Sequence, residues 1–265
     1  MSAWSSLTPM VDALQPHVVA TALIGARLVP VAFLCPLLGG SHAPTHVKLG
    51  LVLALSLFLH VAGGIGLPPG AVNAFDFVGI AFKEVLLGTT LGLIASLPFD
   101  AARMGGRFID LFRGSSAEAA LPMAGTKEAA TGDALYHLLL ALASTGVVMP
   151  LTLAALFKSY TLAPLGTFVH SEDVAMQVAA LVGGAFATGL AIGAPIAGAS
   201  LAVDACLGLA SRAAPGMNLQ DTGAPLRILG GGAVIWLAVG LFAARLQEYA
   251  AGTPDAMRLL LDLGV

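Results

Sequence analysis

Charged residues are scarce in this chain of 265 residues: Asp, Glu, Lys and Arg make up 10% of it, whereas hydrophobic residues make up 57%. A water-soluble domain of this length has no single core large enough to bury so large an apolar fraction. The scarcity of charge therefore excludes an ordinary soluble protein and predicts a membrane protein with the lipid bilayer as its surroundings.

An excess of basic charge is also missing. The formal net charge is -3, and the 12 Lys and Arg residues are scattered singly. Nucleic-acid binding needs a basic face, so nucleic acid is not an expected partner. The first 15 residues contain Asp12 and no Lys or Arg, so they lack the positive region of a secretory signal peptide, and we expect them to be retained.

Cysteine is almost absent, and the arrangements that enzymes use are missing. Cys35 and Cys206 lie far apart in apolar runs, which suits small buried residues better than a disulfide framework. The sequence contains no HExxH and no CxxC, and Pro44 interrupts the helical spacing between His42 and His46. We expect no enzyme activity, no catalytic residue, no metal site and no cofactor.

Six long apolar stretches are present instead. A helix that spans a bilayer needs about 20 apolar residues. The fifth stretch holds Pro195 and is long enough to tilt strongly or to break in two. The sequence predicts an all-α membrane protein of about six apolar helices, some broken by Pro or Gly, in one integral membrane domain over residues 1–265. The stretches cover residues 18–38, 49–67, 77–99, 134–157, 174–203 and 228–244.

The connections between these stretches predict an orientation, because Lys and Arg are retained on the cytoplasmic side. Alternate connections collect seven cations on one side and three on the other, which places both termini away from the cytoplasm. The longest connection, from about Asp100 to Asp133, is too short for a soluble domain. The seven are Lys48, Arg103, Arg107, Arg113, Lys127, Arg212 and Arg227, and the three are Lys158, Arg245 and Arg258.

Three charged residues fall inside predicted spans: Arg27, Lys83 and Glu84. A charge at mid-bilayer costs at least about 2.5–3.5 kcal/mol on insertion scales. Adjacent residues of a helix point about 100° apart, so Lys83 and Glu84 do not simply neutralise each other. One interpretation is a polar lock between helices, with Arg27 paired to Glu84, or the lining of an aqueous path. The other is that the segment lies outside lipid, or that Lys83 snorkels while Glu84 pairs locally.

Pro and Gly interrupt the chain in two places, and small residues repeat in a third. The interrupted stretches run from Pro30 to Lys48 and from Asp204 to Arg227, and each is either irregular backbone that lines a pathway or an ordinary turn. Small residues at four-residue spacing on the fifth stretch predict a close packing surface. These small residues are Ala185, Gly189, Gly193 and Ala197.

Short motifs along the chain give a resemblance to a known family. In this order and spacing they resemble the SpaR/YscT/HrcT (SctT) family of type III secretion, which is related to the flagellar export protein FliR. The likeness extends from about Ala20 to Arg245. The motifs are Ala26 to Pro30, Lys83 to Gly88 with Gly92, Gly105 to Gly114, Lys158 to Tyr160 with Pro164, Pro215 to Asn218 and Gly223 to Arg227.

Details of these motifs favour one branch of the family. The Ile-Asp-x-x-Arg-Gly segment that ends at Gly114 resembles the injectisome proteins of virulence more than the flagellar ones. The family's Pro-Gln-Met-Asn is Pro-Gly-Met-Asn here, with Gly216 in place of the amide. The flagellar relatives have phenylalanines after the glycine, whereas residues 115–123 are mostly alanine here. Leu121 and Met123 are the apolar residues left to seal a channel, and Met suits a deformable seal.

The resemblance implies a subunit of a protein export gate. The chain would assemble with SctR-like and SctS-like membrane proteins, and with the larger export-gate and switch proteins, into a channel entrance for unfolded secreted substrates. It implies helical hairpins in a pseudo-helical assembly in the bacterial inner membrane, partly raised on the periplasmic side. The alternative is a small-molecule secondary transporter, which also uses broken helices and midplane ions.

The resemblance also implies roles for particular residues. A loop from about Gly105 to Met123 would lie near the channel and change between closed and open states. The candidates for this gate are Gly106, Asp110, Arg113, Gly114, Leu121 and Met123. The broken-helix and interface candidates are Pro30, Pro215, Met217, Asn218 and Pro225.

Overall fold

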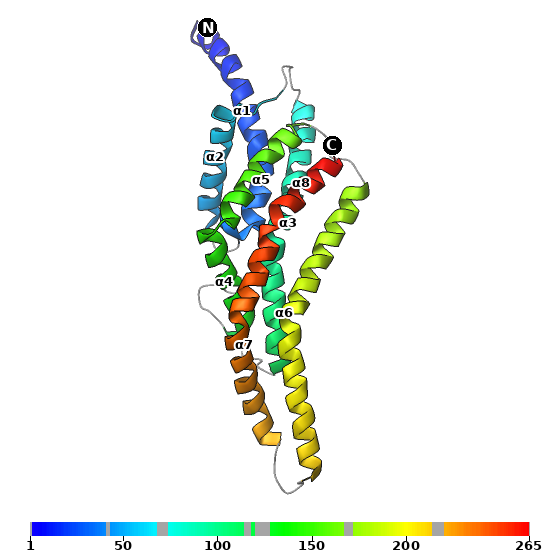
Figure 1. Ribbon diagram of the computed structural model, residues 1–265. Helices are drawn as coiled ribbons and strands as arrows, with labels where there is room; N and C mark the ends of the chain where they lie inside the picture. The colour runs from blue at the N-terminus through cyan, green and yellow to red at the C-terminus, as the bar shows by residue number, and fades with distance from the viewer. Residues whose placement is uncertain are drawn as a thin grey trace. The chain divides into compact units, whose positions relative to one another are not determined.

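The chain folds almost entirely into helices. The computed structural model describes residues 2–40, 43–67, 74–113, 118–119, 128–166, 172–213 and 220–264. A two-residue antiparallel pair joins β1 (Glu118–Ala119) to β2 (Glu128–Ala129). The helices are α1 (Ser2–Leu34), η1 (Pro36–Leu38), α2 (Thr45–Val61), α3 (Ala74–Arg113), α4 (Ala130–Thr145), α5 (Val148–Leu162), α6 (Glu172–Ala213), α7 (Gln220–Ala251) and α8 (Thr253–Gly264), as Figure 1 shows.

Contacts between residues divide the chain into two compact units. Unit 1 consists of Met1–Ser96, Met149–Ala179 and Thr253–Val265, and unit 2 consists of Leu97–Val148 and Ala180–Gly252. Helices α3 and α6 each contribute residues to both units. Each unit has its own core and its own polar contacts.

Unit 1 is built on α1, which lies beside α2. Residues of α1 at helical spacing are buried, among them Ala20, Ile24, Leu28 and Val31, so this helix presents a continuous apolar stripe to its neighbours. Small side chains allow the α1–α2 contact, because a methyl group at Gly25 would lie 3.3 Å from Ser56 Oγ. The stripe and the small residues together form the core of this unit.

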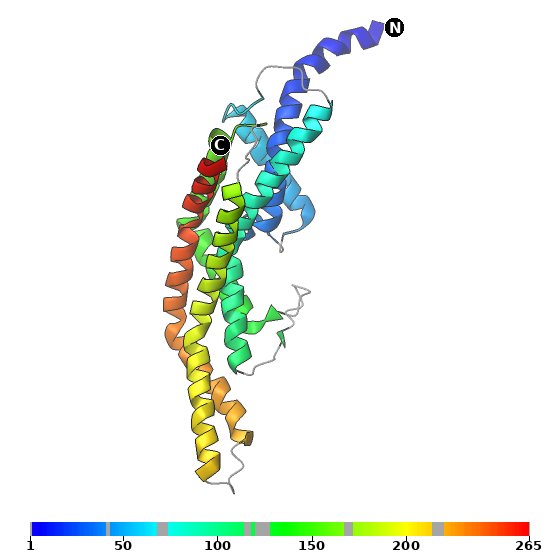
Figure 2. The same cartoon turned by 90° about the vertical axis from the view of Figure 1, so that its right-hand side faces the viewer.

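Unit 2 packs the second part of α3 against α6 through small residues. A methyl group at Gly189 would lie 3.0 Å from the carbonyl oxygen of Ala101, and one at Gly193 would lie 2.8 Å from Cβ of Phe108. The predicted packing surface on α6 is therefore in close contact with α3. Figure 2 shows α7 running alongside α6, and the hydroxyl of Tyr249 donates to the carbonyl of Leu181 across these helices.

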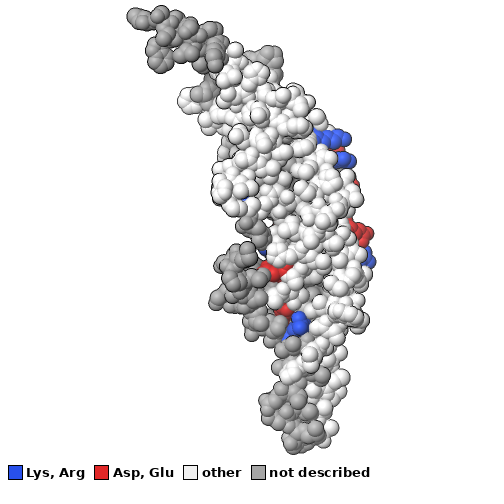
Figure 3. Space-filling model, turned by 90° about the vertical axis from the view of Figure 1, so that its left-hand side faces the viewer, with Lys and Arg blue, Asp and Glu red and all other residues white. Residues whose placement is uncertain are grey.

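The described helices have the length and composition of membrane spans. Four are long and apolar enough to cross a bilayer, and a fifth is obtained if α4 and α5 count as one broken span. Large apolar side chains are widely exposed, Trp236 being 77% accessible. On the face drawn in Figure 3, Lys, Arg, Asp and Glu occupy only a few places. These features confirm the all-α membrane fold with several apolar helices.

Several helix boundaries differ from the expected ones; α1 begins at Ser2 and α7 at Gln220, both earlier than predicted. Helix α3 continues to Arg113, well beyond the predicted end at residue 99, because Asp110 is buried and Arg103 is half-buried against protein instead of entering a loop. Helix α6 continues through Pro195, whose neighbours Ile192 and Ile196 are buried and hold the helix in place. The fourth stretch breaks at residues 146–147, between α4 and α5.

The two cysteines are both free and lie in different surroundings. Cys35 directly follows α1 and is buried, and this burial raises the pKa of its thiol to about 11. It lines an apolar cavity of unit 1 together with Val31, Leu38 and Met149. Cys206 on α6 is exposed in the isolated chain, so the expectation of a buried residue holds for Cys35 alone.

Candidate functional site

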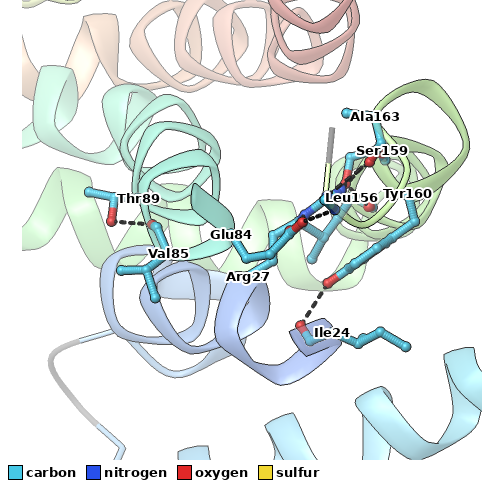
Figure 4. A network of polar contacts seen from close by, with 10 residues as sticks. Ile24, Arg27, Glu84, Val85, Thr89, Leu156, Ser159, Tyr160 and Ala163 are labelled. Atoms are coloured by element: carbon cyan, nitrogen blue, oxygen red, sulfur yellow. Dashed lines mark hydrogen bonds and ion pairs between the residues drawn. The ribbon is translucent and has the colours of Figure 1, made fainter. Parts of the chain in front are cut away.

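Arg27 of α1 is the centre of a buried polar cluster in unit 1. Only 1% of its surface is exposed, and 2% of that of Glu84 on α3. Arg27 Nε donates to Glu84 Oε2 over 2.6 Å, and Figure 4 shows these two side chains turned toward each other. The two charges that a bilayer would penalise are thus neutralised inside the protein.

The remaining donors of Arg27 reach the end of α5. Nη1 donates to the carbonyl of Ser159 over 3.0 Å, and Nη2 donates to the carbonyl of Ala163 over 2.9 Å. The last carbonyls of a helix have no partner within it and carry partial negative charge. Arg27 therefore acts as a cap on α5 that is supplied by another helix.

Tyr160 of α5 completes the surroundings of the guanidinium. Its ring centroid lies 4.2 Å from Cζ of Arg27, in the geometry of a cation–π contact. The hydroxyl of Tyr160 donates to the carbonyl of Ile24 over 2.9 Å. As Figure 4 shows, α1 and α5 are thus linked by polar contacts in both directions.

Glu84 binds the turn after α5 with its second oxygen. Oε1 accepts from the amide of Gly166 over 3.2 Å, and Gly166 has φ +86°, a conformation that favours glycine. One helical turn after Glu84, a methyl group at Gly88 would overlap the carbonyl of Arg27, so glycine permits the close approach of α3 to α1. Lys83 is half-buried beside Glu84 on α3.

The cluster is stable only as a complete set. A buried ion pair is favourable when its remaining hydrogen-bonding groups are also satisfied, whereas removal of one partner leaves a buried charge and costs about 3–5 kcal/mol. Here every nitrogen of the Arg27 guanidinium and both Glu84 oxygens have partners. The arrangement therefore ties α1, α3 and the end of α5 into one unit.

A second polar contact lies in unit 2, where α3 meets α4. Asp110 of α3 is 6% exposed and accepts from the amide of Thr131 over 2.8 Å and from its hydroxyl over 2.5 Å. One turn earlier, a methyl group at Gly106 would overlap the backbone of Gly132. The two helices therefore touch backbone to backbone at the point where the carboxylate binds.

Two arginines border this contact on the same face of α3. Arg103 places its guanidinium over the ring of Tyr136 on α4, with Cζ 3.9 Å from the centroid. Arg113 lies 3.7 Å from Asp110, and its side chain crosses α7, where a methyl group at Gly231 would lie 2.6 Å from Cγ of Arg113. We call the group of Arg103, Gly106, Asp110, Arg113, Thr131, Gly132 and Gly231 the α3–α4 junction.

The predicted site residues lie partly in the two polar contacts, partly elsewhere on helices and partly outside the described residues. It brings Arg27 and Glu84 together, and it places three of the gate candidates, Gly106, Asp110 and Arg113, on helix α3 rather than in a loop. The predicted loop therefore does not begin at Gly105. Pro30 lies in the last turns of α1 and Pro225 inside α7. Gly114, Leu121, Met123, Pro215, Met217 and Asn218 lie outside the described residues.

Several residues of these contacts were not among the predicted site residues. Ser159 and Tyr160 belong to a motif that carried the family resemblance, but neither has a charge that would point to a buried cluster. Thr131 and Gly132 carry no signal of their own. A search for carboxylates one helical turn from a glycine on a long apolar helix would have pointed to Glu84 with Gly88 and to Asp110 with Gly106.

Comparison with known proteins bears directly on the origin of these contacts. The sequence model of the bacterial export proteins, family 1, matches residues 18–252, which include both polar contacts. The chain belongs to this family of bacterial export proteins. The match covers nearly all of the described helices, so the family assignment applies to the whole fold and not to one motif.

Curated relatives of this export protein come from two kinds of apparatus. The flagellar biosynthetic protein FliR of Caulobacter vibrioides is 26% identical over 93% of this chain and 96% of its own length. The Yop proteins translocation protein T of Yersinia pestis is 26% identical over 95% of each chain. The surface presentation of antigens protein SpaR of Shigella sonnei is 26% identical over 76% of this chain and 78% of its own length. Identity alone does not separate the two branches.

Proposed function

We propose that this chain is a subunit of a type III protein export gate. With SctR-like and SctS-like membrane proteins it forms the channel entrance through which unfolded substrates cross the bacterial inner membrane, and the larger export-gate and switch proteins bind around it. The observation that carries the proposal is the family match over residues 18–252, supported by relatives that align over almost their entire length.

The polar cluster of unit 1 supports a structural role in such a gate over transport of a small molecule. A secondary transporter uses charged groups near the midplane to hold its substrate. Here Arg27 and Glu84 are occupied by protein groups, and the cavity beside Cys35 is lined by apolar side chains such as Val31 and Met257. We infer that the chain works as a passive subunit and not as an enzyme. The passage of substrate is driven by energy that other parts of the apparatus supply.

The lengths of the helices support a gate that is partly raised out of the inner membrane. Helices α3 and α6 contain 40 and 42 residues. At about 1.5 Å per residue each is about 60 Å long, twice the hydrocarbon thickness of a bilayer. A large part of each helix therefore lies outside the hydrocarbon layer or is steeply tilted, as expected if partner helices cover the exposed apolar surfaces.

Within the gate we propose that Arg27 and Glu84 form a polar lock. The lock holds α1, α3 and α5 together while the channel opens, so the subunit moves without loss of its core. The injectisome branch remains our prediction for the kind of apparatus, from the Arg113-Gly114 pair. Gly114, Leu121 and Met123 remain the predicted gate residues outside the described part of the chain.

Co-expression tests the proposed function. The chain is produced with its SctR-like and SctS-like partners, extracted in mild detergent and weighed by native mass spectrometry. We expect one hetero-complex of fixed mass that contains all three proteins. A lone chain or a homo-oligomer, at an expression level that yields the partners in quantity, would contradict the proposal.

A topology map tests the inferred placement in the inner membrane. Fusions of alkaline phosphatase and of a fluorescent protein after residue 264 report whether the C-terminus lies in the periplasm or in the cytoplasm. From the distribution of Lys and Arg we expect an active phosphatase. A fluorescent C-terminal fusion with an inactive phosphatase would overturn the orientation and leave the partner assignment to the mass measurement.

A further inference from the structure

The α3–α4 junction places a carboxylate at the beginning of a helix that does not contain it. Helix α4 begins at Ala130, so the amide of Thr131 belongs to its first turn, where amides have no partner within the helix. Asp110 of α3 accepts from this amide over 2.8 Å. A negative charge at this end of a helix is stabilised by the helix dipole. Asp110 therefore caps α4 from outside.

The second oxygen of Asp110 makes the cap specific for Thr131. Oδ1 accepts from the hydroxyl of Thr131 over 2.5 Å and lies 3.7 Å from Nη1 of Arg113. The described contacts of the carboxylate thus include the amide and the hydroxyl of Thr131 and the nearby guanidinium of Arg113. Because it is 6% exposed, water does not replace these partners readily if one of them is removed.

Glycines set the distance at which this cap works. Gly106 lies one turn before Asp110 on the same face of α3 and touches the backbone of Gly132. Any larger residue at position 106 pushes α4 away from α3 and moves Thr131 out of reach. Arg113, one turn after Asp110, lies in the space that Gly231 leaves on α7. The junction therefore joins α3 to α4 and to α7.

We propose that Asp110 is a positioning residue for export. Its cap fixes the beginning of α4 against α3, and the packing of Arg113 in the space at Gly231, which we call the Arg113 seat, fixes α7 against α3. A displaced α4 would change the surface that this subunit contributes to the proposed gate. The export consequence rests on the proposed function, whereas the cap itself can be measured on this chain alone.

Hydrogen exchange on the purified chain tests the cap. In Asp110→Ala we expect the amides of residues 131–133 to exchange roughly tenfold faster, the size typical of a lost charge-assisted cap. Asp110→Asn retains one acceptor oxygen, so we expect its exchange rates at these amides to lie between those of Asp110→Ala and of the parent. Glu248→Gln is the matched control, because it removes one carboxylate from an exposed pair on α7. Unchanged exchange in Asp110→Ala would overturn the cap.

Measurements on the co-expressed complex test the role in export. We expect Asp110→Ala to assemble at parent yield by native mass spectrometry, to secrete several-fold less substrate in cells and to leak several-fold more ions in liposomes. For Asp110→Asn we expect secretion and ion leakage to lie between those of Asp110→Ala and those of the parent. Parent secretion and leakage in an assembled Asp110→Ala complex would overturn the proposal.

Loss of assembly has a different meaning in the Asp110 variants and in the parent chain. Loss of assembly in both Asp110→Ala and the milder Asp110→Asn would mean that the residue only maintains the fold, and would also overturn the positioning role. If the parent chain itself forms no hetero-complex, the proposed function fails instead. The exchange experiment still decides whether Asp110 caps α4 in that case.

Discussion

The two polar contacts both cap a helix end with a charged side chain from another helix, and the two charges are opposite in sign. In unit 1 the cation of Arg27 binds carbonyls at the end of α5, and in unit 2 the anion of Asp110 binds an amide at the beginning of α4. Each charge matches the sign that the helix end requires. Buried charges on one helix of this apolar chain are thus used to complete the end of another helix, which that helix cannot satisfy by itself.

The two contacts differ in what balances the charge. Arg27 has a close counter-ion, Glu84 at 2.6 Å, whereas the described pair of Asp110 with Arg113 is longer at 3.7 Å and stands beside two hydrogen bonds from the neutral Thr131. The Arg27 cluster therefore depends on charge balance, and the described contacts of the α3–α4 junction add hydrogen bonds and close packing. Graded substitutions separate these two dependences.

Loss of Arg27 has the largest expected effect. Arg27→Met leaves Glu84 buried without its counter-ion, and we expect the free energy of unfolding to fall by about 3–5 kcal/mol. The double variant Arg27→Met/Glu84→Gln removes both charges and loses less than the single variant. Arg245→Met is the control, because its pair with Glu248 is exposed. Thermal unfolding of the purified chain in detergent measures these differences, and a double variant less stable than the single one would refute charge balance.

Substitution of the glycines at the helix contacts has the second largest expected effect on stability. Gly88→Ala in unit 1 and Gly106→Ala in unit 2 insert a methyl group into another helix's backbone, and we expect each to cost about 1–3 kcal/mol. Gly79→Ala on the same helix meets nothing within 4 Å and serves as control. The same unfolding assay applies. Equal stability of all three variants would show that α3 does not need glycine for its contacts.

The seat of Arg113 gives a smaller effect. Gly231→Ala places a methyl group 2.6 Å from Cγ of Arg113, but a flexible side chain can move aside, so we expect a loss of about 1 kcal/mol. Gly240→Ala lies on the same helix with nothing within 4 Å. Hydrogen exchange at the end of α3 should increase only in Gly231→Ala, and an equal change in both variants would contradict the seat.

Removal of single hydroxyls includes the smallest expected effect, that of Ser159→Ala, and compares the two contacts most directly. Thr131→Val removes a short bond to a buried carboxylate, and we expect a loss of about 1.5 kcal/mol. Ser159→Ala removes a hydroxyl that accepts from Arg27 over a long 3.3 Å and otherwise donates to the carbonyl of Leu156 within its own helix, so it should cost about 0.5 kcal/mol. Unfolding midpoints in detergent rank the two, and a larger loss for Ser159→Ala would reverse the comparison.

Composition and apolar length predict the helical membrane fold correctly, because bilayer spans need long runs without charge. They misplace helix ends wherever charge is buried against protein. Helix α3 was expected to end at residue 99, yet Arg103 and Asp110 extend it, since stacking on Tyr136 and bonds to Thr131 replace the water that hydropathy assumes. The break at residues 146–147 was missed because no charged residue interrupts the stretch on either side.

The polar partners could be predicted only where a charge makes burial costly. Arg27 and Glu84 are conspicuous inside apolar stretches, so sequence reasoning could suggest their pairing. Ser159, Ala163 and Gly166 contribute backbone groups to the same cluster, and a backbone carbonyl or amide leaves no trace in residue type. Family resemblance points to some of these segments without showing what they bind.

The Arg27 cluster sets an order of events during synthesis of the chain. Glu84 follows Arg27 by 57 residues, and Ser159 follows it by 132. At 5–20 residues per second, α1 exists for roughly ten seconds before the ribosome has made the carbonyls that its arginine will bind. Synthesis of this subunit therefore begins with a charge whose counter-ion and carbonyl partners are made only later, first Glu84 and then the end of α5.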